Sequence, residues 1–149
     1  MKGDRDTDCA GCVDAATTGL PASGMGRAVP ADRPSALAAL ALSEYEARRQ
    51  RDALFEPGLF AEPAWDMLLD LYVHHHRRRP VSIQSLCIAA AVPQTTAIRW
   101  IRHLADIGLV ARQRSDRDNR VVHIVLTARG IGHLERYLGE RLHALRTLD

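Results

Sequence analysis

A predicted helix over residues 93–107 has side chains that can form hydrogen bonds with the edges of nucleic-acid bases. Its apolar residues recur at the spacing of one helical face and predict a buried stripe: Ala97, Trp100, Ile101 and Leu104. Its polar residues lie off this stripe: Gln94, Thr95, Thr96, Arg99, Arg102 and His103. An α-helix fits the major groove of B-DNA, where Arg, Gln and Thr side chains can contact base edges. The chemistry that this helix suggests is recognition of duplex DNA.

Positive charge is concentrated around this helix and the segment after it. Residues 94–125 contain six arginines and three aspartates, a local excess of +3, and extending the stretch back to Arg77, Arg78 and Arg79 raises it to +6. The whole chain has a formal net charge of only +2. Such clustering is typical of a surface that binds nucleic acid. Because Lys2 is the only lysine and alanine is abundant, codon composition also favours arginine, and the raw arginine count has little weight.

Two helices, a turn and a hairpin are predicted in this part of the chain. Ser82 is the expected cap of the first helix, since its hydroxyl can accept a hydrogen bond from the first turn. Pro93 suits the first turn of the second helix, and Gly108 suits the left-handed residue that ends it. Strands over residues 109–114 and 121–126 follow, joined by a short polar loop. This order predicts a helix-turn-helix followed by an arginine-rich hairpin.

A distinctive string of residues runs from the end of the second helix through the hairpin: Gly108-Leu109-Val110, Arg112, Asp116-Arg117-Asp118-Asn119-Arg120, Val125-Leu126-Thr127 and Gly130. This string resembles the wing of MarR-type winged-helix transcription regulators. The resemblance extends over residues 63–130, about half of the chain. It implies a mainly α fold with a small β-hairpin, in which a winged helix-turn-helix domain is flanked by N- and C-terminal dimerisation helices.

The resemblance also implies roles for individual residues. The helix over residues 93–107 would enter the major groove, and an arginine of the hairpin tip, Arg117 or Arg120, would enter the minor groove. Asp118 would steady the loop. Asn119 stands where the inserted arginine is usual, so which residue goes deepest is left open. The full set of expected DNA contacts is Gln94, Thr95, Thr96, Arg99, Arg102, His103, Arg112, Arg114, Arg117, Asn119 and Arg120.

Three further helices are predicted around this region. The helix over residues 63–76 should bury Trp65, Leu68, Leu69 and Tyr72 and expose Asp66 and Asp70 on its polar side. Helices over residues 35–52 and 128–148, the latter capped by Thr127, have apolar stripes that exceed the need of a small core. Leftover apolar surface predicts a second copy of the chain. The expected dimerisation residues are Leu37, Leu40, Tyr45, Ile131, Leu134, Leu138, Leu142 and Leu145.

Several cysteines and histidines invite a metal or redox interpretation. Cys9 and Cys12 form a C-x-x-C, but a zinc site needs four ligands and no second pair exists. Cys87 is flanked by apolar residues, which favours a core position over a reactive thiol. Consecutive helical side chains point about 100° apart, so His74, His75 and His76 are expected to complement the helix end rather than share an ion. No metal or cofactor is expected.

Length and composition limit the number of domains and the class of protein that the chain can form. The length of 149 residues and the hydrophobic content of 46% suit one domain, expected over residues 34–149. Residues 1–33 contain too few large apolar groups to fold and are expected to form an N-terminal tail. No leader or membrane-spanning run is seen, so a cytoplasmic location is expected. No phosphate loop, H-E-x-x-H or G-x-S-x-G motif supports an enzyme.

Two functions remain open. The first is a transcription regulator that binds double-stranded DNA as a homodimer. The alternative is a winged-helix protein-interaction module that docks an acidic partner, since one fold serves several functions. Relatives of the resembled type often hold a small-molecule effector between the dimer helices and the DNA-binding lobe. This chain has one helix after the wing where that family commonly has two, so the existence of such a pocket stays open.

Overall fold

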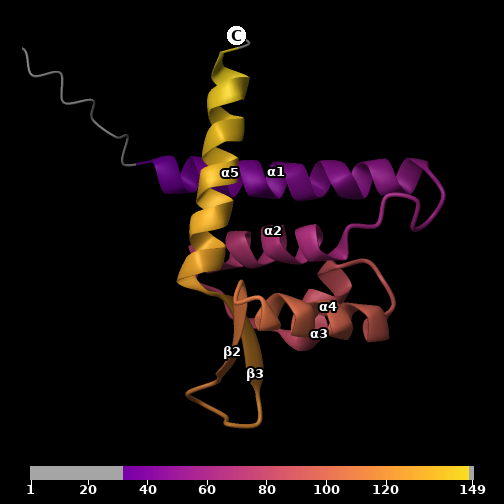
Figure 1. The fold of residues 1–149 in the computed structure, drawn as a ribbon, viewed down its shortest axis with the longest axis vertical. Coiled ribbons are helices and arrows are strands. Elements are labelled where there is room, and N and C mark those ends of the chain that lie inside the picture. Colours follow the sequence, from indigo (N-terminus) through magenta and orange to yellow (C-terminus); the bar gives the residue numbers. More distant parts are fainter. Residues whose placement is uncertain (1–31, 148–149) are drawn as a thin grey trace, which may run out of the picture.

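The computed structural model describes residues 32–147 as five helices and a three-stranded sheet (Figure 1). The elements in chain order are α1 (Arg33–Leu54), α2 (Pro63–His76), β1 (Val81–Ser82), α3 (Ile83–Ala89), α4 (Gln94–Asp106), β2 (Val110–Arg114), β3 (Val122–Leu126) and α5 (Ala128–Arg146). The mainly α fold with a small hairpin is therefore confirmed. Most of the expected tail, with Cys9 and Cys12, lies outside the described residues. Within that described range, no helix is both long and apolar enough to cross a bilayer.

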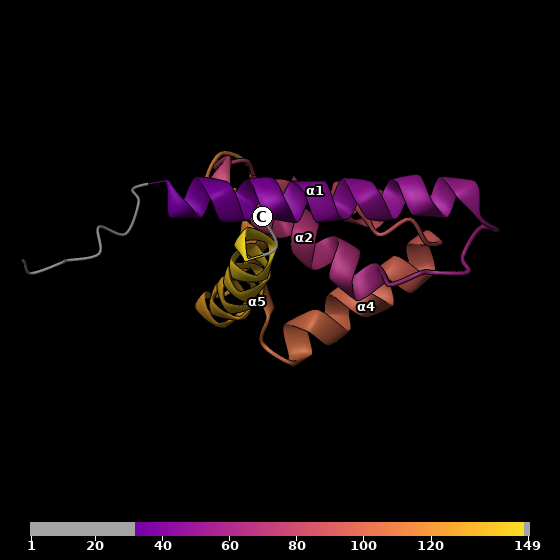
Figure 2. The same cartoon turned by 90° about the horizontal axis from the view of Figure 1, so that it is seen from above.

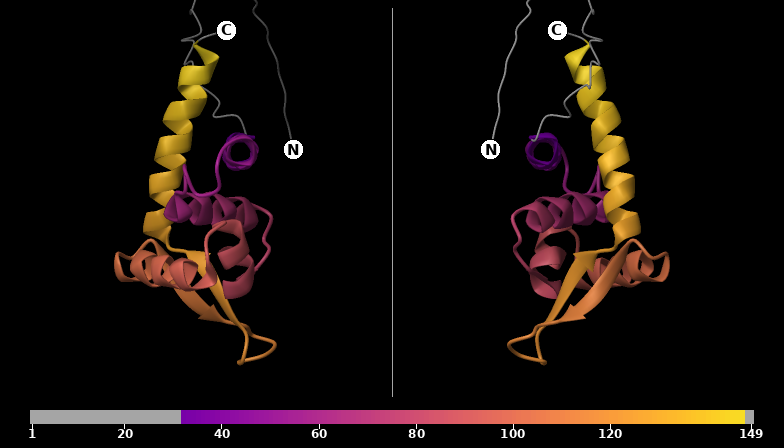
Figure 3. Two further views of the ribbon diagram at one scale, coloured as in Figure 1. Left: turned by 90° about the vertical axis from the view of Figure 1, so that its right-hand side faces the viewer. Right: turned by 90° about the vertical axis from the view of Figure 1, so that its left-hand side faces the viewer.

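The helices are arranged in layers beneath α1. Helices α1 and α2 run one above the other, with α3 and α4 in the next layer, and the β2–β3 hairpin projects beyond them at the far end (Figure 1). Helix α5 crosses α2 and α1 and ends on the opposite side of the molecule from the hairpin tip (Figure 3). Seen from above, α1 lies across α2, and α4 and α5 diverge on one side of it (Figure 2).

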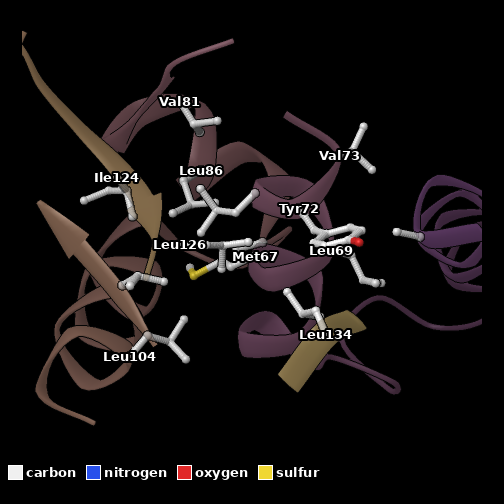
Figure 4. Close-up of a cluster of buried hydrophobic side chains, with 14 of the residues drawn as sticks. Met67, Leu69, Tyr72, Val73, Val81, Leu86, Leu104, Ile124, Leu126 and Leu134 are labelled. Atoms are coloured by element: carbon white, nitrogen blue, oxygen red, sulfur yellow. The ribbon is translucent and has the colours of Figure 1, made fainter. Parts of the chain in front are cut away.

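Helix α2 is the centre of the hydrophobic core. Its buried residues face in several directions: Pro63, Asp66, Met67, Leu69, Leu71, Tyr72 and Val73. One side contacts α1 and α5, and the other contacts α3, α4 and β3 (Figure 4). The prediction of a single stripe was therefore incomplete: Trp65 and Leu68 are only half-buried, and Met67 and Leu71 were missed. A helix that is surrounded by partners buries more than one face.

The predicted helix and turn signals are confirmed with one adjustment. The Ser82 hydroxyl accepts a hydrogen bond from the Ser85 N–H at 3.0 Å, and Thr127 does the same for Gly130 at 3.1 Å. Gly108 has φ +74° at the end of α4, as expected of a left-handed terminator. Pro93 is the residue before the first helical turn rather than within it, so α4 begins at Gln94.

The sheet has the order β1-β3-β2, and all its pairs are antiparallel. Strand β2 pairs with β3 from Val110 opposite Leu126 to Arg114 opposite Val122. Strand β1 pairs with β3 through Val81 opposite Ile124. The sequence did not predict β1, because two residues are too few to show a periodic pattern.

The two flanking helices, α1 and α5, bury more of their apolar side chains within one chain than the sequence predicted. Leu37, Leu134 and Leu138 are at most 3% exposed, because α5 packs across both α1 and α2. They belong to the core of a single copy and are not free to contact another. Leu40, Tyr45, Ile131 and Leu142 are half-buried, and Leu145 is 41% exposed. The predicted dimerisation surface is thus smaller than expected, and its exposed part lies toward the end of α5. Leu54, at the end of α1, is exposed as well, at 81%.

Asp66 corrects a second expectation. It was placed on the polar side of its helix, yet it is 1% exposed. Arg48 and Arg49 of α1 reach its two carboxylate oxygens at 2.6 and 2.5 Å. Arg48 also pairs with Glu62. Burial of a carboxylate is tolerated when cations and hydrogen bonds satisfy it, and helical periodicity alone cannot reveal a partner that lies on another helix.

Candidate nucleic-acid interface

Helix α4 is anchored by one face and exposes the other. Its inner residues Ala97, Ile101 and Leu104 are at most 2% exposed and join the hydrophobic core. The polar residues predicted to contact DNA lie on the remaining surface: Gln94, Thr95, Arg99, Arg102 and His103 are exposed, and Thr96 is half-buried. An amphipathic helix held in this way presents a rigid polar face to a partner.

Trp100 departs from the predicted buried stripe. It is only half-buried, and it lines a surface hollow together with Thr96, Arg99 and His103. Its ring lies 5.6 Å from that of His103 in an edge-to-face arrangement. The stripe rule placed Trp100 inside because it is three residues from Ala97, but the core contacts are centred on Ala97, Ile101 and Leu104. The tryptophan therefore borders the polar face of α4.

The junction between α4, the hairpin and α5 is closely fitted. The Thr127 hydroxyl donates to the Gly108 carbonyl at 2.7 Å, and the Leu109 N–H donates to the Leu104 carbonyl at 2.9 Å. At Gly130, an added Cβ would lie 2.3 Å from the Leu109 carbonyl oxygen, so only glycine allows α5 to start this close to β2. The orientation of α4 relative to the hairpin is thus set by close contacts to the main chain of Gly108 and Leu109.

The two faces of the hairpin carry different side chains. Arg112 lies opposite Ile124, and Gln113 lies opposite His123. Directly opposed residues in an antiparallel pair share a face, so Arg112 is on the face to which the buried Ile124 belongs. Arg114, two residues further along the strand, is on that same face. The other face carries Gln113 and His123.

The loop at the hairpin tip is ordered by a side chain. The Asp118 carboxylate accepts a hydrogen bond from the Arg120 N–H at 2.9 Å, the kind of steadying contact that the resemblance implied for Asp118. The Val121 N–H donates to the Asp118 carbonyl at 3.0 Å. Arg117, Asn119 and Arg120 are exposed around this turn. Their backbone is held while their side chains are free to reach outward.

Within residues 32–147, the arginines of this surface form no salt bridges. In the part of the chain that the structure describes, the salt bridges fall on α1, α2, α5 and Glu62, the residue before α2. None involves the arginines of α4 or of the hairpin: Arg99, Arg102, Arg112, Arg114, Arg117 and Arg120. Unpaired guanidinium groups spread over a helix and a neighbouring hairpin form a positive surface that suits the phosphates of a duplex.

The metal and thiol candidates have structural explanations. Cys87 is 7% exposed, and burial raises the pKa of its thiol, which disfavours the reactive thiolate. The imidazole of His74 lies 2.9 Å from the Asp70 carbonyl and 3.4 Å from the Asp70 carboxylate, one turn back on α2. Across residues 32–147, no group of three or more histidine, cysteine or acidic side chains is placed to hold a metal ion.

Comparison with known proteins finds one matching family model and several solved structures of similar fold. The family model described as "Winged helix DNA-binding domain" matches residues 65–130. The structure of an S. aureus MepR–DNA complex is 21% identical over 72% of this chain and 78% of its own, with a TM-score of 0.53. S. aureus MepR in its DNA-binding conformation is also 21% identical, covering 72% and 77%, with a TM-score of 0.48. Lactococcus lactis ZitR, as the E41A mutant, is 14% identical, covering 63% and 62%, with a TM-score of 0.43.

No curated protein gave a significant match. The family match spans the segment from α2 to the first turn of α5, which includes the whole of α4 and the hairpin. The structural likeness extends over the flanking helices as well, because it covers 72% of the chain. Residues 65–130 therefore match the family model of winged helix DNA-binding domains, and the fold of the chain is similar to that of the protein in the MepR–DNA complex.

Proposed function

We propose that the protein regulates transcription by binding double-stranded DNA as a homodimer. The observation that supports this most strongly is the joint placement of the exposed polar face of α4 and the arginine hairpin beside it. The matched family is one of DNA-binding domains, and a structure of similar fold was solved as a MepR–DNA complex. The proposal contains no catalytic step, and it places the protein in the cytoplasm, where it can reach DNA.

In the proposed complex, α4 enters the major groove and the hairpin, here called the wing, follows the duplex to the minor groove. Gln94, Thr95 and Arg99 lie at the start and along the outer side of α4, where they would meet base edges. Arg117 and Arg120 would lie at the minor groove or its phosphates, where narrow grooves attract arginine. The fixed junction at Gly108 and Gly130 would keep the two contacts in register.

The homodimer part of the proposal relies on the outer turns of α5. Helix α5 extends past α1 toward its C-terminal end (Figures 1 and 3). On this part Leu142 is half-buried and Leu145 is 41% exposed, one turn apart. A second copy that packs against these turns would cover them about a two-fold axis. Two recognition helices would then bind half-sites about one helical turn apart.

Selection of bound sites from random-sequence duplexes tests the proposal. We expect a pseudo-palindromic site, because a symmetric dimer binds two related half-sites. Binding to unrelated duplex should be weak and should fall steeply as salt increases, because phosphate contacts release counterions. The alternative, a winged-helix module that docks an acidic protein, predicts no selected site. Failure to enrich any sequence, together with salt-independent binding to duplex, would refute the DNA-binding proposal.

A further inference from the structure

Four large apolar side chains are exposed together where α1 ends and the chain turns toward α2. They are Leu54, Phe55, Leu59 and Phe60, here called the apolar loop, and each is between 37% and 81% exposed. No other seven-residue stretch within residues 32–147 exposes more than one large apolar side chain. Contiguous apolar surface of this kind typically marks a protein–protein contact.

The apolar loop is held in shape by contacts of its own. The rings of Phe55 and Phe60 pack edge to face with their centroids 5.3 Å apart. The Arg51 guanidinium lies 4.5 Å from the centre of the Phe60 ring and donates a hydrogen bond to the Phe60 carbonyl at 3.3 Å. Gly58 has φ +83°, a conformation that lets the chain turn back here. Side chains that are ordered before binding lose less entropy when a partner docks.

Helix α5 does not cover the apolar loop of its own copy. It crosses α1 in the first half of that helix: the Tyr137 hydroxyl donates to the Glu44 carboxylate at 3.0 Å, and an added Cβ at Gly139 would lie 3.2 Å from Arg33. The apolar loop follows the opposite end of α1 (Figures 1 and 2). The turns of α5 after Gly139 extend past α1, and Leu145 on them is left exposed. Each copy therefore has two separate apolar surfaces without a cover.

The two surfaces have opposite charge. Around the apolar loop, residues 51–62 contain one arginine and three carboxylates, a net charge of −2. At the end of α5, residues 136–146 contain three arginines and one glutamate, a net charge of +2 with histidine neutral. Opposite potentials favour association, whereas like charges brought together oppose it. Charge therefore favours pairing of the loop with α5 over pairing of loop with loop or of α5 with α5.

We propose that the apolar loop of one copy binds the C-terminal turns of α5 of a second copy. Leu142 and Leu145 would pack against the loop, and the exposed Glu56 would face Arg141 and Arg146 at the rim. A two-fold axis makes this contact reciprocal, so it occurs twice in the dimer. The inference rests on the proposed homodimer and names the contact that holds it together.

Two single variants disturb opposite sides of this contact. Leu59→Lys places a positive charge where the basic end of α5 would dock. Leu145→Glu places a negative charge where the acidic surroundings of the apolar loop would dock. Each variant has the defect in both contacts of its own dimer, and like charges brought together weaken binding. We expect the dissociation constant of either homodimer to rise about tenfold or more.

An equimolar mixture of the two variants should recover the dimer. In the mixed dimer one contact has no substitution, and in the other contact the two introduced charges are opposite and lie together. The mixed dimer should therefore be about tenfold or more tighter than either variant alone. Sedimentation at equal total concentration measures this recovery as a larger mean mass of the mixture. A dimer held by α5 against α5 would give no such recovery.

Ile88→Lys is the matched control. Ile88 of α3 is an exposed apolar residue outside both surfaces, so the same change there should leave the dimer as in the wild type. Leu59 and Leu145 are also exposed in a single copy. Both test variants should therefore keep the wild-type melting temperature, which circular dichroism measures.

The outcomes separate this contact from the homodimer itself. A wild type that dimerises together with a Leu59→Lys variant that dimerises equally well would refute the contact alone, and the apolar loop would then be covered by another segment or another protein. Dissociation of both variants without recovery in the mixture would show that α5 does not meet the loop. A wild type that is monomeric at micromolar concentration would refute the homodimer and this contact together.

Discussion

Arg48 of α1 donates a hydrogen bond from Nε to the Asp66 carboxylate of α2 at 2.6 Å, and Asp66 is 1% exposed. This ion pair joins the long N-terminal helix to the first turn of the central core helix. Arg49 binds the other oxygen of the same carboxylate at 2.5 Å. The packing of α1 on the winged-helix domain therefore depends on a buried charge cluster as well as on apolar contacts.

Replacing Asp66 with alanine should destabilise the protein strongly. The change would leave Arg48 buried without its main partner, and breaking a buried pair in this way costs about 3–5 kcal/mol. The exposed Arg136–Glu140 pair on α5, at 3.8 Å, is the control: Glu140→Gln should change stability by less than about 0.5 kcal/mol. Urea unfolding of both variants measures the difference. Equal stability of the two would contradict the structural role of Asp66.

Ile101 should contribute more than Trp100 to the stability of the fold. Ile101 is 1% exposed, so Ile101→Ala should cost roughly 2–5 kcal/mol as a core truncation. Trp100 is half-buried at the edge of the polar face, so Trp100→Ala should cost less than the roughly 3–5 kcal/mol of a fully buried tryptophan. Thermal unfolding compares the two variants. A greater loss of stability in Trp100→Ala would mean that its ring is buried.

Arg99→Ala should reduce affinity for the selected DNA site without affecting the fold. Arg99 is exposed on α4, and removal of a side chain that binds a base costs about 1–3 kcal/mol and relaxes specificity at one base position. Competition binding with single-base variants of the selected site measures both effects. Undiminished affinity and unchanged specificity would show that this side of α4 does not face the bases.

The double variant Arg117→Ala, Arg120→Ala should weaken binding to all duplex sequences. Both side chains are exposed at the wing tip, and removing an arginine that binds a phosphate should flatten the dependence of affinity on salt by roughly one unit of slope. Arg136→Ala on α5, also exposed, removes a surface arginine away from the wing, and this control should keep the wild-type slope. A wild-type slope in the wing variant would place the wing away from the DNA.

Leu145→Glu should dissociate the proposed dimer while leaving each copy folded. Leu145 is 41% exposed, so a charge there costs little in a single copy but would be buried unpaired in an interface. Ala144→Glu adds the same charge at the neighbouring exposed position and should retain the dimer. Sedimentation gives the mass of each variant, and circular dichroism checks the fold. A wild-type protein that is monomeric at micromolar concentration would contradict the dimer.

Stability should fall in alkali through the tyrosines. Burial, aided by the negative charge of Glu135 and opposed by Arg33, raises the pKa of Tyr72 to about 12 from an unfolded value of 10.0. A raised pKa favours the protonated form in the fold, so this stabilisation is complete below pH 10 and is lost as the pH rises toward 12. Burial also raises the pKa of Tyr45 and Tyr137.

Tyr72→Phe is the matched variant for this effect. The Tyr72 hydroxyl is buried and has no hydrogen-bond partner within residues 32–147, so phenylalanine loses no bond there. Urea unfolding at a series of pH values should show a weaker alkaline decline in the variant than in the wild type. An identical decline in both proteins would mean that Tyr72 does not contribute to it.

The local elements could be predicted from the sequence because their signals are local. Ser82 and Thr127 mark helix starts through hydrogen bonds to residues three positions away, and Gly108 marks a helix end through its own φ angle. The wing resembles a known pattern over one continuous stretch of sequence. These features need no information about the rest of the chain. The polar face of α4 was likewise evident from helical periodicity.

Contacts between side chains of different segments could be known only from the tertiary structure. Asp66 has the polarity of a surface residue, and only the approach of α1 brings Arg48 and Arg49 to it and makes burial favourable. From the sequence, Leu134 and Leu138 were expected to lie at a dimer interface. They are buried within one copy because α5 packs across α1 and α2. Burial and charge pairing depend on distances between segments, which a periodic pattern within one segment does not contain.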